Sequence, residues 1–264
     1  MDNLMVEDIQ FLAAAFGLGV FAVYSISWFL DKSPVSDWFK ASEGIAVSFI
    51  TVPAFLFGLG MSSLTTNIIN NKDTAKISLI NEVSAIRTLV NIASTLPAQD
   101  QVKLNSGIND YVVAVINKEW ANMMSKDPSI NGLAFPEFES LSSTVNQIAS
   151  TPHQNSFVAN RLESSIDSIR HERLVRLNLA QEKINLLKWP SFFSLSFLML
   201  FSIGLLQLRA PRAMRIALTM GALCIGTTVL FIFLNSSPYG GNQPVKPNLL
   251  EESLKRIDLL PQKH

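Results

Sequence analysis

The residues of this sequence that could do metal chemistry are few and widely separated. His171-Glu172 matches the first part of a zinc-protease helix motif, in which a second histidine four residues after the first completes the metal site. Position 175 is a valine, and the other two histidines are isolated. Cys224 is the only cysteine, which excludes an intrachain disulfide and a cysteine-based zinc site. We therefore predict no metal site and no cofactor.

The acidic residues offer little for acid–base catalysis. Glu137 and Glu139 stand near the start of a predicted helix, where the positive end of the helix dipole favours carboxylates. Two other pairs have the i,i+4 spacing of solvated surface pairs: Asp167 with His171, and Glu172 with Arg176. The sequence contains no glycine-rich phosphate loop. We therefore predict that the protein is not an enzyme.

The composition indicates a membrane protein. The chain has 264 residues, of which 48% are apolar and 16% charged, against the about 25% charged residues usual in soluble domains. Its 21 basic and 21 acidic residues give a formal net charge of zero, which argues against a nucleic-acid binder that neutralises phosphates. Membrane lipid is the expected surrounding, and nucleic acid is not an expected partner.

The uncharged stretches of the sequence are long enough to cross a bilayer, which takes about 20 apolar residues as a helix. The predicted spans cover about residues 9–30, 44–64, 189–208 and 216–234. For the first span a cleaved signal peptide is the alternative, but Asp2, Glu7 and Asp8 make its start acidic where a signal peptide is basic. We predict an all-α integral membrane protein with four transmembrane helices.

The rest of the chain is expected to be helical and outside the membrane. The N-terminal hairpin (1–64) and the C-terminal hairpin (189–234) flank an extramembrane domain at 65–188, where apolar residues recur every three or four positions. In the tail, 235–264, an amphipathic helix is predicted from Leu249 to Leu260. We favour its packing on the helical domain, and attachment to a lipid surface is the alternative.

One face of the second predicted span is small, hydroxylated or aromatic. The residues that form this stripe are Ser48, Thr51, Phe55, Gly58, Ser62 and Thr65. Such a stripe could line a pore, but small and hydroxyl side chains also let helices pack closely within a membrane. No predicted span contains an ionisable residue, which argues against a proton relay or a voltage sensor.

Two polar residues after the second span, Glu82 and Arg87, are candidates for the wall of a vestibule close to the membrane. The alternative for Glu82 is that a buried carboxylate holds helices together. Glu119-Trp120 has the same ambiguity, and core packing is favoured there.

The charges beside the spans leave the orientation open. Arg209, Arg212 and Arg215 in a short loop favour a cytoplasmic position for that loop. On the opposite side of the predicted membrane, five basic residues precede the third span: Arg170, Arg173, Arg176, Lys183 and Lys188.

Several short motifs occur in an order that is familiar from one family. These motifs are Asn81-Glu82-Val83, Leu96-Pro97, Tyr111, Glu119-Trp120 and Pro238-Tyr239-Gly240. In this order, and with the layout of two hairpins around a helical domain, the sequence resembles the bestrophin-like domain family of four-span membrane proteins. That family is distantly similar to the bestrophins, which are pentameric anion channels with the second span lining the pore.

The resemblance implies a homo-oligomer, a pentamer by analogy, that passes small anions passively. It places the narrowest part of the pore in 52–58, and the helical domain and both termini in the cytoplasm of a bacterial inner membrane. The second hypothesis, from a different class, is a membrane-anchored interaction protein or scaffold that conducts nothing.

Overall fold

The computed structural model describes residues 2–41, 43–123, 130–151, 155–181, 188–235, 237–240 and 244–258. Within these residues every regular element is a helix, which confirms the all-α prediction. The elements in chain order are α1 (Asp2–Lys32), α2 (Ser36–Ala41), α3 (Glu43–Ala93), α4 (Ala98–Ala114), the π-helix η1 (Val115–Trp120), α5 (Ile130–Leu133), α6 (Phe135–Ala149), α7 (Ser156–Gln181), α8 (Lys188–Leu206), α9 (Pro211–Leu234) and α10 (Asn248–Asp258).

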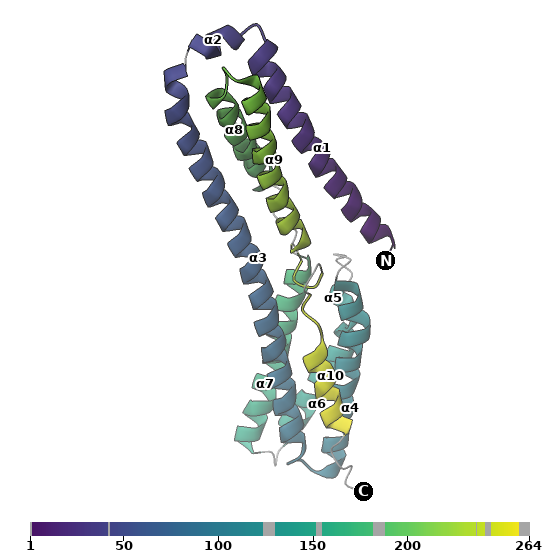
Figure 1. The fold of residues 1–264 in the computed structure, drawn as a ribbon. Helices are drawn as coiled ribbons and strands as arrows, with labels where there is room; N and C mark the ends of the chain where they lie inside the picture. The colour runs from purple at the N-terminus through teal and green to yellow at the C-terminus, as the bar shows by residue number, and fades with distance from the viewer. Residues whose placement is uncertain are drawn as a thin grey trace. The chain divides into compact units, whose positions relative to one another are not determined.

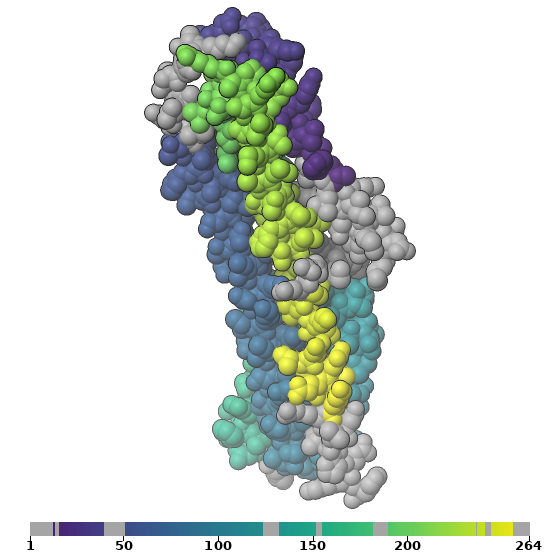
Figure 2. Space-filling view, in the orientation of Figure 1, coloured from purple at the N-terminus to yellow at the C-terminus, as the bar shows by residue number. Residues whose placement is uncertain are grey.

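The chain forms two compact units. The first unit consists of residues 1–68 and 183–236, and the second consists of residues 69–182 and 237–264. In the first unit α1 packs on α8 and α9, and α2 joins α1 to α3 (Figure 1). Figure 2 shows the side chains of α9 on the surface of the first unit and those of α10 on the surface of the second.

Helix α3 belongs to both units. The second predicted span is its first part, and the same helix continues through the polar residues 65–67 and 70–71. Between Met61 and Leu96 the sequence contains neither glycine nor proline, so nothing ends the helix until the segment before Pro97. Pro53 lies inside α3.

The core of the first unit is small and apolar. Ile26 and Leu30 of α1 are buried against Leu200 of α8 and Leu218 of α9. Gly204 of α8 makes this packing possible, because a Cβ atom there would lie 2.5 Å from Leu30 Cδ1. The close approach of α1 to α8 therefore depends on the missing side chain.

The core of the second unit is larger and draws on α3, α4, η1, α6 and α7. Its fully buried members include Ile86, Leu104, Ile108 and Leu141. The tail helix α10 contributes Leu250, which is fully buried in the same cluster. This is the packing favoured above for the amphipathic tail.

Two described segments are long and apolar enough to cross a membrane. They are Thr51–Ala93 in α3 and Pro211–Leu234, which is α9. The apolar part of α8, Pro190–Leu206, is shorter. The four-span topology therefore stays a prediction.

Candidate functional site

The stripe on the first part of α3 lies on one side of the helix. Thr51, Phe55, Gly58 and Ser62 are exposed, and a Cβ atom added at Gly58 would meet no other atom within 4 Å. Thr65 is half-buried, and Ser48 falls in the part of α3 whose side chains are outside the described residues.

The opposite side of α3 is the side that contacts α8. The Phe57 and Phe192 rings have their centroids 5.7 Å apart. A Cβ atom at Gly60 would lie 3.6 Å from Leu195 Cδ1. At about 100° per residue, Gly60 is roughly half a turn away from the stripe. The contacts of α3 with α8 therefore use the side away from the stripe, whereas Ser62 and Thr65 at the end of the stripe line a pocket together with Thr227 and Phe231 of α9.

A second set of polar residues lies in the core of the second unit, around Arg176 of α7. Its guanidinium group is fully buried and donates from Nε to Glu82 Oε2 at 3.0 Å. Nη2 of the same group donates to Glu82 Oε1 and to Glu119 Oε2, each at 3.1 Å. Arg176 thus joins a carboxylate of α3 to a carboxylate of η1.

Two further residues complete the hydrogen bonding of these carboxylates. Arg173, one turn before Arg176, donates from Nε to Glu119 Oε1 at 3.0 Å and from Nη2 to the same oxygen. Tyr111 donates its hydroxyl to Glu82 Oε1 at 2.6 Å. We call Glu82, Tyr111, Glu119, Arg173 and Arg176 the buried ion cluster.

The π-helix explains how Glu119 reaches this cluster. Tyr111, Val115, Glu119 and Met123 are all buried, and they recur every fourth residue. In an α-helix with 3.6 residues per turn, each step of four residues turns the side chain by about 40°, so three steps would carry it about 120° away from the core. The wider turn of η1 offsets this drift and keeps Glu119 on the buried side.

Aromatic rings cover the cluster. The Arg176 guanidinium carbon lies 5.3 Å from the centre of the Trp120 ring, and Trp120 meets Tyr239 edge to face at 5.6 Å. Arg173 lies over Phe138 at 5.9 Å. Tyr239 belongs to the tail, so the Pro238-Tyr239-Gly240 motif closes the cluster from a distant part of the sequence.

Burial and charge together set the ionisation of these groups. Burial raises the pKa of the Tyr111 phenol well above its usual value, and the negative charge of Glu82 raises it further. Burial also raises the pKa of Tyr239. Burial alone would lower the pKa of Arg176, but the two carboxylates Glu82 and Glu119 outweigh this effect and raise it. In the cluster two arginine side chains are paired with two glutamate side chains, so their formal charges sum to zero.

These contacts correct one prediction made from spacing alone. Arg176 is not a solvated partner of Glu172, because its guanidinium group is fully buried against Glu82 and Glu119. Glu172 instead accepts a hydrogen bond from Asn81 Nδ2 at 3.0 Å. Asp167, for which the spacing predicts His171 as the partner, forms an ion pair with Arg170 at 3.0 Å. Spacing along one helix could not reveal carboxylates that come from α3 and η1.

The two vestibule candidates differ in their surroundings. Glu82 has no exposed surface, and its carboxylate accepts hydrogen bonds from Tyr111 and Arg176, the kind of contact that the helix-bridging alternative describes. Arg87 is partly exposed and lies 3.8 Å from Glu252 of α10. Among the described residues there is no group of three or more histidine, cysteine, aspartate or glutamate side chains that could hold a metal ion.

An all-helical chain with long, uncharged and partly exposed helices is typical of helical membrane proteins. The model of the Bestrophin-like domain family matches residues 17–250. The chain therefore belongs to this family. No curated protein is significantly similar to it in sequence.

Solved structures share the fold. A bacterial bestrophin homologue from Klebsiella pneumoniae, in a mutant form, is 11% identical with a TM-score of 0.58, and the match covers 97% of this chain and 100% of that chain. A second structure of that homologue has 11% identity and a TM-score of 0.59 over 94% of this chain and 96% of that chain. A structure described as a membrane protein is 11% identical with a TM-score of 0.60 and covers 98% of both chains.

Proposed function

We propose that this protein is a homo-oligomeric membrane channel that passes small anions passively. In this proposal four helices of each subunit cross the membrane, the two hairpins flank the helical domain, and the first part of α3 surrounds the symmetry axis. The helical domain and both termini lie in the cytoplasm of a bacterial inner membrane. Membership of the bestrophin-like family supports the proposal.

The observation that carries the proposal is the stripe on α3. It is uncharged and bears hydroxyl groups, and its members Thr51, Phe55 and Gly58 are exposed in the single chain. Phe55, for example, is 64% exposed. Along an aqueous axis the hydroxyl groups of this surface can form hydrogen bonds to water or to a permeating ion. Contact with lipid would give them no such role.

The buried ion cluster takes a positioning role in this proposal. It joins α3 to η1 and α7 in the second unit, so it holds the second part of α3 against the rest of the helical domain. Its charges are balanced and enclosed, and they are not expected to bind the permeating anion.

Chloride efflux from liposomes tests the channel. Purified protein reconstituted into chloride-loaded vesicles is expected to release chloride faster than empty vesicles do. An absence of flux above the empty vesicles, across several pH values and calcium levels, would contradict the proposal and favour the scaffold hypothesis.

A matched pair of variants tests the role of α3. Gly58→Trp places a large ring on the stripe and is expected to lower chloride efflux at least about tenfold. Leu56→Trp adds the same ring to the same helix at an exposed position about 140° away from the stripe. Efflux through this control is expected to stay within about twofold of the unmodified protein. Equal effects of both variants would remove the stripe from the pore.

A reporter fused after His264 tests the orientation. Activity of a cytoplasmic reporter is expected, and activity of a reporter that functions only in the periplasm would reverse the proposed sidedness.

A further inference from the structure

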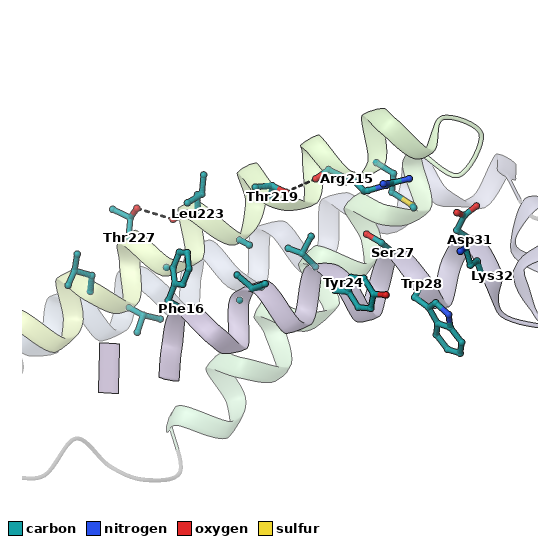
Figure 3. Close-up of a pocket in the computed structure, with 18 residues that line it drawn as sticks. Phe16, Tyr24, Ser27, Trp28, Asp31, Lys32, Arg215, Thr219, Leu223 and Thr227 are labelled. Atoms are coloured by element: carbon teal, nitrogen blue, oxygen red, sulfur yellow. Dashed lines mark hydrogen bonds between the residues drawn. The ribbon is translucent and has the colours of Figure 1, made fainter. Parts of the chain in front are cut away.

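A groove runs along the first unit between α1 and α9 (Figure 3). Its volume is about 830 Å³, and both walls come from antiparallel helices of the same unit. The walls are mainly apolar, and several of their large side chains are strongly exposed, among them Phe16 (69%) and Leu223 (58%). A surface of this kind is shaped to receive an apolar ligand.

Two glycines keep the groove open. Gly19 of α1 and Gly226 of α9 both line it, and a Cβ atom at either position would meet no other atom within 4 Å. Larger residues at these positions would fill the space between the helices. The groove therefore owes part of its volume to missing side chains.

All the charged residues of the groove lie at one end. Lys32 and Asp31 of α1 and Arg215 of α9 line this end, which has a net charge of +1 (Figure 3). None of the three forms an ion pair with another described residue. Two basic groups on facing helices can bind one phosphate between them.

Further polar groups lie close to the charged end. Ser27 lines the groove, and its Oγ is buried without a hydrogen-bond partner in the described part of the chain. Tyr24 and Trp28 line the same region and are exposed. Tyrosine and tryptophan with this exposure are favoured at the level of lipid headgroups.

The remaining length of the groove suits an acyl chain. From Arg215 to Leu230 the groove follows α9 for about 22 Å at 1.5 Å per residue, which exceeds the about 15 Å depth of one hydrocarbon leaflet. This wall carries no charge beyond Arg215, and its two threonines, Thr219 and Thr227, donate their hydroxyls to carbonyls of their own helix. The far end therefore offers little to a polar ligand.

We propose that the groove binds one anionic phospholipid, with its phosphate between Lys32 and Arg215 and an acyl chain along α1 and α9. The groove has a basic end and an uncharged wall. A phospholipid with an anionic headgroup and an uncharged acyl chain matches this arrangement. Asp31 can accept a hydrogen bond from a headgroup hydroxyl, as glycerol provides. The inference rests on the membrane placement of the first unit proposed above, but it does not require conduction.

Native mass spectrometry of the purified full-length protein in mild detergent tests the headgroup preference. With equal amounts of phosphatidylglycerol and phosphatidylcholine of identical chains, phosphatidylglycerol is expected to be retained at least about fivefold more, the ratio that one additional basic contact provides. Glycerol 3-phosphate at the same concentration is expected not to displace it. Displacement by this free phosphate, or equal retention of the two lipids, would overturn the proposal.

Matched variants locate the site. Lys32→Gln with Arg215→Gln is expected to reduce the preference to about one, whereas Arg212→Gln, at an exposed position in the first turn of α9 that does not line the groove, is expected to retain it. Gly226→Leu is expected to lower retention of both lipids without changing their ratio. Loss of the preference in Arg212→Gln to the same extent would place the lipid elsewhere.

A photo-reactive benzoylphenylalanine in place of Tyr24 identifies the occupant. Cross-linking to phospholipid is expected, and cross-linking to a second copy of the chain would assign the groove to a subunit interface. Failure of the channel proposal is distinguishable, because lipid retention is read from mass and chloride efflux is not involved. Extraction of the protein by carbonate wash would instead defeat both proposals.

Discussion

At the scale of single residues, the most consequential arrangement is the buried ion cluster. Two arginines and two glutamates would each be costly to bury alone, and they are tolerated because every carboxylate oxygen accepts a hydrogen bond from Arg173, Arg176 or Tyr111. Removing one member leaves a charge without its partner in the same apolar surroundings. The cluster should therefore be sensitive to single changes.

Arg176→Met is expected to reduce the free energy of unfolding by about 3–5 kcal/mol, because Glu82 and Glu119 lose a partner that no water can replace. Arg161→Met is the matched control on the same helix, since Arg161 is exposed, and it is expected to change stability by less than about 0.5 kcal/mol. Denaturant unfolding of the purified protein, followed by circular dichroism, measures both. Similar losses in the two variants would contradict the role of the cluster.

Tyr111→Phe removes only the hydroxyl that donates to Glu82. Because the acceptor is charged and buried, a loss of about 1.5–3 kcal/mol is expected. The same unfolding measurement applies. An unchanged stability would indicate that Glu82 is satisfied by Arg176 alone.

The raised pKa values of Tyr111 and Tyr239 predict a loss of stability in alkali. In the unfolded chain a tyrosine ionises near pH 10, whereas the folded chain keeps both protons to a higher pH. Since the unfolded state then binds fewer protons, stability is complete below about pH 10 and falls as the pH rises beyond it. Thermal unfolding between pH 8 and 11 is expected to show this decline, and Tyr111→Phe with Tyr239→Phe should make it shallower. An identical slope in the double variant would contradict this cause.

At the scale of elements, close helix packing in the first unit depends on small residues. A Cβ atom at Gly204 would approach Leu30 Cδ1 to 2.5 Å and Ile26 Cγ2 to 3.3 Å. Both leucine and isoleucine are held in the buried core, so α1 and α8 would have to separate. The helices of this unit are therefore positioned by glycine as much as by apolar side chains.

Gly204→Ala is expected to destabilise the first unit by about 1–3 kcal/mol through overpacking. Gly17→Ala is the control, because a Cβ atom at Gly17 meets nothing within 4 Å. This control is expected to be neutral or slightly stabilising, since alanine favours the helix. The melting temperature in detergent compares the two, and equal values would show that the helices adapt without cost.

At the scale of the whole molecule, the proposed channel function depends on subunit number. One helix per chain can surround an axis only if several copies assemble, so the channel proposal expects an oligomer of more than two chains in mild detergent. Mass measurement of the purified protein tests this expectation. A monomer or dimer would favour the membrane-anchored scaffold.

The helical class and most helix positions followed from the sequence, because the spacing of apolar residues and the positions of prolines act locally. The tail helix predicted to begin at Leu249, for instance, begins at Asn248 and is described as far as Asp258. The continuity of α3 through its polar residues was less evident, because polarity indicates exposure to water and does not by itself end a helix.

The sequence by itself determined the composition of the spans, the stripe on α3 and the family, since each depends on residue types and their order. Only the tertiary structure decided which side of α3 contacts α8, that Arg176 meets Glu82 and Glu119, and that Lys32 and Arg215 stand at one end of a groove. These facts join residues that are 57 to 183 positions apart. Such pairs are brought together by the packing of whole helices, and no local pattern in the chain encodes that packing.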